Sequence, residues 1–384
     1  MLTQTLDTQM REWRQNFHQY PELNFDLELT APKVADLLNN FGLETHEGIG
    51  RSGVVGVLKN GSGKKSIGIR ADMDALPVNE TNDLNYKSKY EGKMHACGHD
   101  GHMSMALGAA KFLSENRKFD GTVYFIFQPD EEKTQGAQAM IDDGLFNQFS
   151  IDEVYAFHNM PGMSLGSFAT RPGTITASES IFKIELWGQG GHSALPHMGV
   201  DTITVGTQII TSLQSIVSRK LNPAMNGVVS VTDFKSNGNE NVLPGYSIIT
   251  GDTRALSPDA NKIIESSMND IVKGIAAAHG IKVEFSYKTR TNMTINSREQ
   301  TLAAAKVASS MVGSQNVDSN CEPKLFSEDF SQMLMVKPGC FILIGNGLEG
   351  SHAQSLHSSN YNFNDELLVI GSTFWSELVM SRLS

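Results

Sequence analysis

The sequence has little of what marks secreted, membrane-spanning or nucleic-acid-binding proteins. Its three cysteines, Cys97, Cys321 and Cys340, are too far apart to resemble a secreted disulfide framework, so we expect reduced thiols. No run of about eighteen apolar residues is present, and Met1 to Thr5 do not begin a basic segment followed by an apolar one. We therefore expect an unprocessed cytoplasmic protein.

Basic residues are also scarce. Lysine and arginine number 31 against 42 aspartates and glutamates, which gives a formal charge of -11. Nucleic acids and anionic lipid surfaces bind basic proteins, so we expect neither as a partner. Glycine, in contrast, is abundant and spread through the 384 residues, which indicates many tight turns between short elements. A chain of this length can form two packed domains.

Helices and apolar strands alternate over much of the chain. Apolar residues at helical spacing predict helices at residues 6–20, 28–41 and 364–380, and a further helix after His99. Continuous apolar runs are typical of strands that are buried on both faces. The expected strands are residues 54–58, 66–70, 122–127, 154–157 and 341–344. This alternation predicts an α/β fold around a mostly parallel sheet.

The order of elements changes between residues 177 and 291. The pattern there is strand, helix, strand, strand, helix, strand, which is the order of a complete ferredoxin-like unit. The six elements are expected at residues 181–187, 202–218, 228–234, 246–250, 259–278 and 283–287. We therefore predict a main domain made of residues 1–176 and 292–384, interrupted by an inserted α+β domain at 177–291.

Ionisable side chains recur where the expected strands end. They are Asp72 and Asp74 after the strand at 66–70, Glu131 and Glu132 after that at 122–127, and His158 after that at 154–157. Cys97 and His99 come just before a helix, and His357 lies near the end of the chain. Ligands of open parallel sheets bind beyond the carboxyl ends of the strands. We expect these groups to meet there.

Together these residue types suit a metal ion. A thiolate, imidazoles and carboxylates match zinc, and manganese is compatible with the oxygen ligands. Each signal is weak alone, because a Cys-Gly-His sequence or a single histidine is more often structural and paired glutamates are more often a solvated surface. Their joint placement predicts the metal site, and two ions are plausible.

Several motifs resemble those of a known family. The most specific is Met94-His-Ala-Cys-Gly-His-Asp-Gly-His102, which occurs together with Gln128-Pro-Asp-Glu-Glu132. With Gly190-Gly-His-Ser193 and Asn241-Val-Leu-Pro244, they make the chain similar to the M20 metallopeptidases. Within that family the chain resembles the amidohydrolase branch, which includes hippurate hydrolases, N-acyl-amino-acid deacylases and indoleacetyl-amino-acid hydrolases. The resemblance covers nearly the whole chain.

The resemblance implies a role for each residue at the expected metal site. Glu131 would be the general base, which takes a proton from the attacking water and later passes it to the leaving amine. Asp74 would orient a ligating histidine, and Asp72 is a weaker candidate for that role. Two divalent ions, zinc or manganese with cobalt or nickel as alternatives, are implied. Their ligands would be Cys97, His99, Glu132, His158 and His357.

The resemblance also implies roles for residues of the inserted domain. In family members with the Gly-Gly-His-Ser motif, the histidine reaches the active site of the partner subunit, so His192 would donate a hydrogen bond to the oxyanion within a homodimer. The alternative is a loop histidine among flexible glycines. Asn241 and Arg254 are candidates for substrate binding. The family commonly has Gly-Thr-x-Arg where this chain has Gly251-Asp-Thr-Arg254, so a surface arginine is the alternative for Arg254.

The expected activity is the metal-dependent hydrolysis of N-acyl amino acids, which releases a carboxylate and a free amino acid. A dipeptidase or carboxypeptidase of the same family would differ only on the acyl side of the bond. A binding protein without turnover would be expected to lack Glu131 or a ligand. Asp130 replaces the alanine that is common in the family, so we expect a different pocket wall. His18, His95 and His102 are expected to shape the fold or support the ligands.

Overall fold

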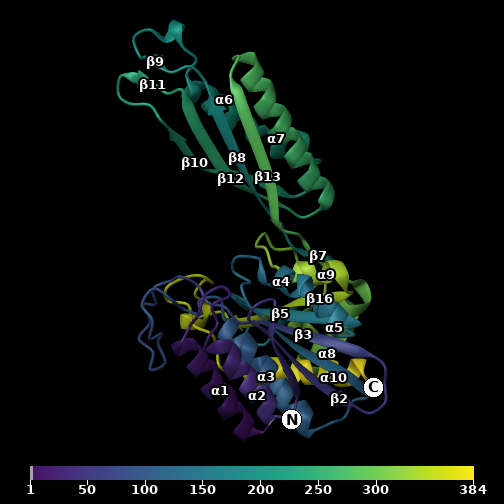
Figure 1. The fold of residues 1–384 in the computed structure, drawn as a ribbon. Coiled ribbons are helices and arrows are strands. Elements are labelled where there is room, and N and C mark those ends of the chain that lie inside the picture. The colour runs from purple at the N-terminus through teal and green to yellow at the C-terminus, as the bar shows by residue number, and fades with distance from the viewer. Residues whose placement is uncertain (1–2) are drawn as a thin grey trace. The chain divides into compact units, whose positions relative to one another are not determined.

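A computed structural model describes residues 3–384 and divides them into two units with separate hydrophobic cores (Figure 1). Met1 and Leu2, which begin the segment expected to lack a leader, lie outside the described residues. The first unit contains the chain up to Ile175, Ile295–Glu322 and Asp329–Ser384, and the second contains Thr176–Thr294 and Pro323–Glu328. The predicted division, with an insert at residues 177–291, did not include the return of Pro323–Glu328 to the second unit.

An eight-stranded sheet with the order β1-β2-β4-β3-β5-β16-β6-β15 forms the centre of the first unit. The four neighbours β4, β3, β5 and β16 are parallel, whereas β1 and β2 pair antiparallel at one edge. Every residue of β3 and β16 is buried, as expected for apolar strands covered on both faces. The strands are β1 (Glu44–Ile49), β2 (Gly53–Asn60), β3 (Ser66–Asp72), β4 (Gly121–Gln128), β5 (Glu153–Pro161), β6 (Phe168–Ala169), β15 (Val317–Asp318) and β16 (Gly339–Gly347).

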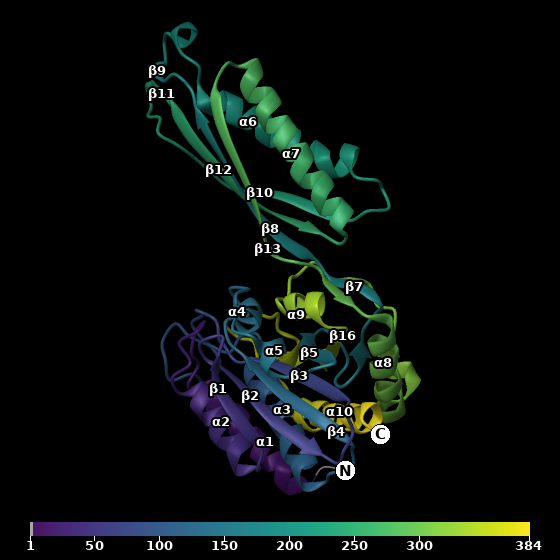
Figure 2. The same ribbon diagram turned by 45° about the vertical axis from the view of Figure 1, so that its right-hand side comes forward.

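Helices cover both faces of this sheet. α1, α3 and α10 pack together on one face, and α4 and α9 lie on the other (Figure 2). The helices of the first unit are α1 (Gln4–Gln19), α2 (Thr30–Asn40), α3 (His99–Glu115), α4 (Gly136–Asp142), α5 (Leu145–Gln148), α8 (Arg298–Val312), α9 (Phe330–Val336) and α10 (Leu367–Arg382). Among residues 3–384, no helix combines the length and apolar character needed to cross a bilayer.

The second unit is an antiparallel sheet with the order β10-β12-β8-β13, and α6 and α7 pack on it to form the second core. Its elements are β8 (Ser178–Trp187), β9 (Gly191–His192), α6 (Thr202–Leu213), the π-helical turn Ile216–Lys220, β10 (Gly227–Ser236), β11 (Val242–Leu243), β12 (Tyr246–Ala255), α7 (Pro258–Ala278) and β13 (Lys282–Thr291). Sheet order and element order match the expected ferredoxin-like unit, so the predicted fold class is confirmed.

A few elements differ from the expectation. The antiparallel strand β1 was missed because its residues are mostly polar and half-exposed. β5 continues through His158 to Pro161 and does not end at Phe157. The helix expected at 202–218 breaks after Leu213 into the π-helical turn. The remaining short elements are β7 (Gly173–Thr176), β14 (Thr294–Asn296) and 3₁₀ turns at Pro196–Met198, Ser314–Asn316 and Gly350–Ala353.

Candidate metal centre

The five predicted metal ligands form one cluster in the first unit. The Cys97 sulfur lies 3.2 Å from Nε2 of His158. The two carboxylate oxygens of Glu132 lie 3.8 Å from Nε2 of His99 and 3.5 Å from Nε2 of His357. Ligand atoms within 4.8 Å of one another form the groups Cys97, His99, His158 and Cys97, Glu132, His357. Cys97 belongs to both groups, so the two groups together contain all five predicted ligands.

Backbone carbonyls orient two of the imidazoles. Nδ1 of His99 lies 2.7 Å from the carbonyl oxygen of Asp74, and Nδ1 of His158 lies 2.8 Å from that of Asn159. A carbonyl oxygen only accepts hydrogen bonds, so each Nδ1 must carry the proton. When each ring is neutral, as a bound metal requires, the lone pair of Nε2 is directed at the cluster. Asp74 thus orients His99 through its backbone.

The carboxylate of Asp74 has a separate contact. Its two oxygens accept hydrogen bonds from the backbone N–H groups of Glu131, at 3.0 Å, and of Glu132, at 3.2 Å. Because β3 and β4 are adjacent and parallel, Asp74 and the glutamate pair follow neighbouring strand ends. The hydrogen bonds fix the turn that carries both glutamates.

The chemistry of the donor atoms fits divalent cations. Nε2 of His99 and Oε1 of Glu132 are buried and have no hydrogen-bond partner within residues 3–384. Unpaired buried polar atoms are costly, and a cation would satisfy both. Burial, followed by the charges of Glu132 and Glu131, raises the pKa of the Cys97 thiol well above its ordinary value. Burial also raises the pKa of Glu132 to about 7. The cluster therefore needs positive charge to hold its thiolate and carboxylate.

Asp72 is occupied by neighbours other than the ligating histidines. Its oxygens lie 2.8 Å from a guanidinium nitrogen of Arg70 and 2.6 Å from Nδ1 of His102. Its nearest approach to Nε2 of His99 is 3.6 Å. The second ring nitrogen of His102 lies 2.7 Å from Oδ1 of Asn159. Both nitrogens of His102 are engaged, so His102 supports the cluster and is not available as a ligand.

Two supporting residues were missed in the sequence. Nδ2 of Asn159 donates a hydrogen bond of 2.6 Å to the hydroxyl of Tyr361, and both residues are buried. Asn159 follows His158 directly, so its position beside a ligand was the signal that could have identified it. Nothing in the sequence pattern marks Tyr361, because its contact spans 202 residues.

His18 and His95 are buried near the cluster but are not part of it. The ring nitrogens of His18 lie 2.8 Å from Asp100 and 3.2 Å from Glu80. Both nitrogens of His95 are buried without a hydrogen-bond partner among the described residues, and burial lowers its pKa to about 3. His18 links α1 to the first turn of α3, next to His99, which agrees with the expected structural role.

Asp130 has an unusual environment. Its backbone is in the left-handed region at φ 50°, and both carboxylate oxygens are buried without a hydrogen-bond partner within residues 3–384. Burial, together with the charge of Asp74, raises its pKa to about 7. The carboxyl group is not among the atoms that cluster with the five ligands.

The other predicted site residues lie in the second unit. Nδ1 of His192 accepts a hydrogen bond of 3.1 Å from the backbone N–H of Ala194, so Nε2 carries the ring proton. The side chain of His192 is exposed, as is that of Asn241. The guanidinium of Arg254 contacts two carboxylates and a hydroxyl: Glu179 at 3.1 Å, Asp252 at 3.0 Å and Ser327 at 3.1 Å. These contacts use much of its capacity to bind a substrate carboxylate.

A protein-family model described as peptidase family M20/M25/M40 matches residues 68–381. The chain belongs to this family. The family predicted from the motifs is thereby confirmed, and the five clustered residues and Glu131 all lie within the matched region.

Similarity to individual M20 relatives extends over almost the entire chain. A hippurate hydrolase of Campylobacter jejuni is 40% identical over 100% of this chain and 99% of its own. Thermostable carboxypeptidase 1 of Saccharolobus solfataricus is 35% identical over 94% of this chain and 91% of its own. A solved Bacillus subtilis structure described as a dinuclear metal binding M20 peptidase has a TM-score of 0.87 at 28% identity and covers 99% of both chains. These similarities support a divalent-metal hydrolase.

Proposed function

We propose that this M20 protein hydrolyses the amide bond of N-acyl amino acids, with an acetyl or aromatic acyl group, to release a carboxylate and a free amino acid. The main support is the donor cluster, in which Cys97, His99 and His158 are buried, with Glu131 directly beside Glu132. The 40% identity to a hippurate hydrolase supports the substrate class. The substrate is a small molecule, and the cytoplasm is the proposed location.

The five clustered residues would hold two divalent ions, zinc or manganese in the first place and cobalt or nickel as substitutes. When bound, such ions polarise the amide carbonyl and lower the pKa of water. Cys97 would be among the ligands, and the carbonyl oxygens of Asp74 and Asn159 would keep the imidazoles of His99 and His158 directed at the cluster. Glu131 takes the proton of the attacking water and delivers it to the leaving nitrogen.

The active form is proposed to be a homodimer, or an oligomer built from dimers. His192 of one subunit would donate its Nε2 proton to the oxyanion in the active site of the partner subunit. The tautomer supports this role, because Nδ1 already accepts a hydrogen bond from Ala194. Asn241 and Arg254 are proposed to contact the substrate. Arg254 is the weaker candidate, since its contacts with Glu179 and Asp252 are already present.

A substrate panel tests this function. Purified protein is analysed for bound metal and assayed with ninhydrin, which detects released amino acid, on N-acetyl and N-benzoyl amino acids and on dipeptides. We expect metal-dependent release from the N-acyl amino acids. Release only from dipeptides would establish the alternative, a dipeptidase or carboxypeptidase, which the similarity to the Saccharolobus carboxypeptidase favours. If the protein bound metal but hydrolysed no substrate of the panel, it would be a metal-dependent binding protein.

A further inference from the structure

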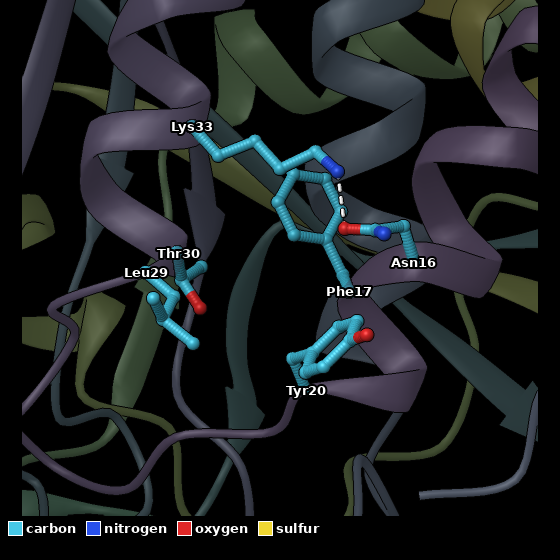
Figure 3. A pocket seen from close by; sticks show the side chains of 6 residues that line it. All are labelled: Asn16, Phe17, Tyr20, Leu29, Thr30 and Lys33. Atoms are coloured by element: carbon cyan, nitrogen blue, oxygen red, sulfur yellow. Dashed lines mark hydrogen bonds between the residues drawn. The ribbon is translucent and has the colours of Figure 1, made fainter. Parts of the chain in front are cut away.

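A cavity between α1 and the start of α2 shares no residue with the metal centre. Its volume is about 310 Å³, and it is lined by Asn16, Phe17, Tyr20, Leu29, Thr30 and Lys33. Figure 3 shows the rings of Phe17 in α1 and of Tyr20, which follows α1, on one side, Leu29 and Thr30 on the other, and the Lys33 side chain crossing above them. A cavity of this size suits a small organic molecule.

The cavity combines apolar walls with one cationic group. The Lys33 amine lies 5.4 Å from the centre of the buried Phe17 ring and donates a hydrogen bond to Oδ1 of Asn16 (Figure 3). Lys33 forms no ion pair with any residue between 3 and 384, and burial lowers the pKa of its amine. A partly buried ammonium group without a counter-ion is stabilised by an anion.

Two hydroxyl groups, those of Thr30 and Tyr20, belong to residues that line the cavity. The hydroxyl of Thr30 faces the space between the two helices (Figure 3). The hydroxyl of Tyr20 lies 2.5 Å from the amine of Lys89, which also lies 4.5 Å from the centre of the Tyr20 ring. Lys89 therefore helps to hold the Tyr20 ring, which forms one aromatic wall of the cavity.

We propose that this cavity binds a small aromatic carboxylate. The carboxylate group would accept hydrogen bonds from the Lys33 ammonium and the Thr30 hydroxyl, and the aromatic ring would lie between the rings of Phe17 and Tyr20 and the side chain of Leu29. Inorganic phosphate fits less well, because most of the lining is apolar. The site does not depend on the proposed hydrolysis, since it uses none of the residues assigned to that reaction.

Fluorine NMR of 4-fluorobenzoate with the metal-loaded protein tests the site. A carboxylate can also bind at the metal centre, so a variant must identify the cavity signal. Lys33→Met removes the charge and keeps the chain length. We expect it to remove one bound signal, or to weaken that binding at least about tenfold, while hydrolysis is unchanged. Lys33→Arg keeps the charge and should keep the signal.

Two comparisons make the outcome decisive. The neutral analogue 4-fluorobenzamide has the same ring and should bind the cavity at least about tenfold more weakly than the carboxylate. If every bound signal of 4-fluorobenzoate were unchanged in Lys33→Met, or if the amide bound as tightly as the carboxylate, the proposal would be overturned. Should Lys33→Met fail to fold, Lys33→Gln replaces it. The NMR experiment measures binding and the substrate panel measures hydrolysis. Failure of this proposal and failure of the proposed function can therefore be distinguished.

Discussion

At the scale of single residues, the two adjacent glutamates differ in their surroundings although they share a turn. Both backbone N–H groups bind the carboxylate of Asp74, which fixes the turn. The carboxylate of Glu132 lies between His99 and His357, both within 4 Å. Glu131 is buried beside it, lies outside the two groups that contain Cys97, and forms a further group of possible ligand atoms with His99 and Glu132. A ligand and a proton carrier can therefore be adjacent in the sequence.

Glu131→Gln should separate these two roles. The amide cannot accept a proton, so turnover should fall by roughly 10²- to 10⁴-fold, while metal content and fold stay unchanged. Steady-state kinetics with N-acyl amino acids and metal analysis of the same preparation measure both. Glu132→Gln is the matched control, and it should lose metal as well as activity. Near-normal turnover of metal-loaded Glu131→Gln would falsify the assigned base.

Asp130 gives a prediction about stability and pH. Its folded-state pKa of about 7 lies above its ordinary value of 3.8, so the folded state binds more protons between these values. This contribution to the free energy of unfolding is complete below about pH 4 and is lost as the pH rises to about 7. Asp130→Asn tolerates the left-handed backbone and cannot ionise. Between about pH 4 and 7 the free energy of unfolding of this variant should therefore depend less on pH than that of the parent protein. At about pH 8 the variant should be more stable by on the order of 1 kcal/mol.

Urea unfolding of the chelator-treated protein between about pH 4 and 8 measures this difference. Asp142→Asn, at an exposed position of α4, serves as the comparison variant with the same chemical change. If the free energies of unfolding of Asp130→Asn and the parent protein changed in parallel with pH, the Asp130 carboxyl would not titrate as described.

At the scale of elements, the first turn of α3 depends on one glycine. Gly98 precedes the helix with φ 91°, and a Cβ atom there would lie 2.4 Å from Oδ1 of Asn159 and 2.6 Å from the hydroxyl of Tyr361. The residues on either side, Cys97 and His99, are both predicted ligands. Close approach of the backbone to Asn159 and Tyr361 therefore places the ligands, and a side chain at Gly98 would displace them.

Gly98→Ala should lower both stability and metal affinity. The left-handed backbone alone costs about 1–2 kcal/mol for a non-glycine residue, and the steric conflict adds to this. Gly92→Ala is the matched control, because Gly92 also has a positive φ of 73° but no atom within 4 Å of the added Cβ. Urea unfolding and competition with a metal-binding dye measure the two effects. Equal losses in both variants would contradict a special role for the contacts of Gly98.

At the scale of the whole molecule, the proposed sharing of active sites between two subunits depends on His192. This residue lies in the second unit, on a loop whose residues 192–198 are all exposed. The short pair β9 and β11 holds this loop, with His192 opposite Val242. An exposed, structurally defined histidine with a protonated Nε2 is suited to act on a site formed by another chain.

A heterodimer of two inactive variants tests this arrangement. One subunit carries Glu131→Gln and the other His192→Ala. If His192 acts in the partner's site, the site with intact Glu131 receives an intact histidine, and about half of the parental activity should return. If His192 acts within its own subunit, both sites stay defective. A purified, metal-loaded heterodimer as inactive as both parent variants would rule out the shared site.

Much of the centre was predictable because its residues follow strands. Asp74, Glu131 and Glu132 come directly after apolar runs, and parallel strands place such residues at one sheet edge by their geometry alone. His99 was predictable from its motif at the start of a helix. The same local regularity gave the ferredoxin-like order of the second unit, since hydrophobic periodicity records which face of each element is buried.

The sequence alone therefore determined the family and the α/β class, and it predicted which residues would bind metal. Only the tertiary structure decided how those residues are held. The contacts of His102 with Asp72 and of Asn159 with Tyr361 join segments 30 and 202 residues apart, and the unpaired carboxyl of Asp130 depends on which of the described groups surround it. Hydrophobic patterns report burial along one element, whereas such hydrogen bonds depend on where separate elements meet in space.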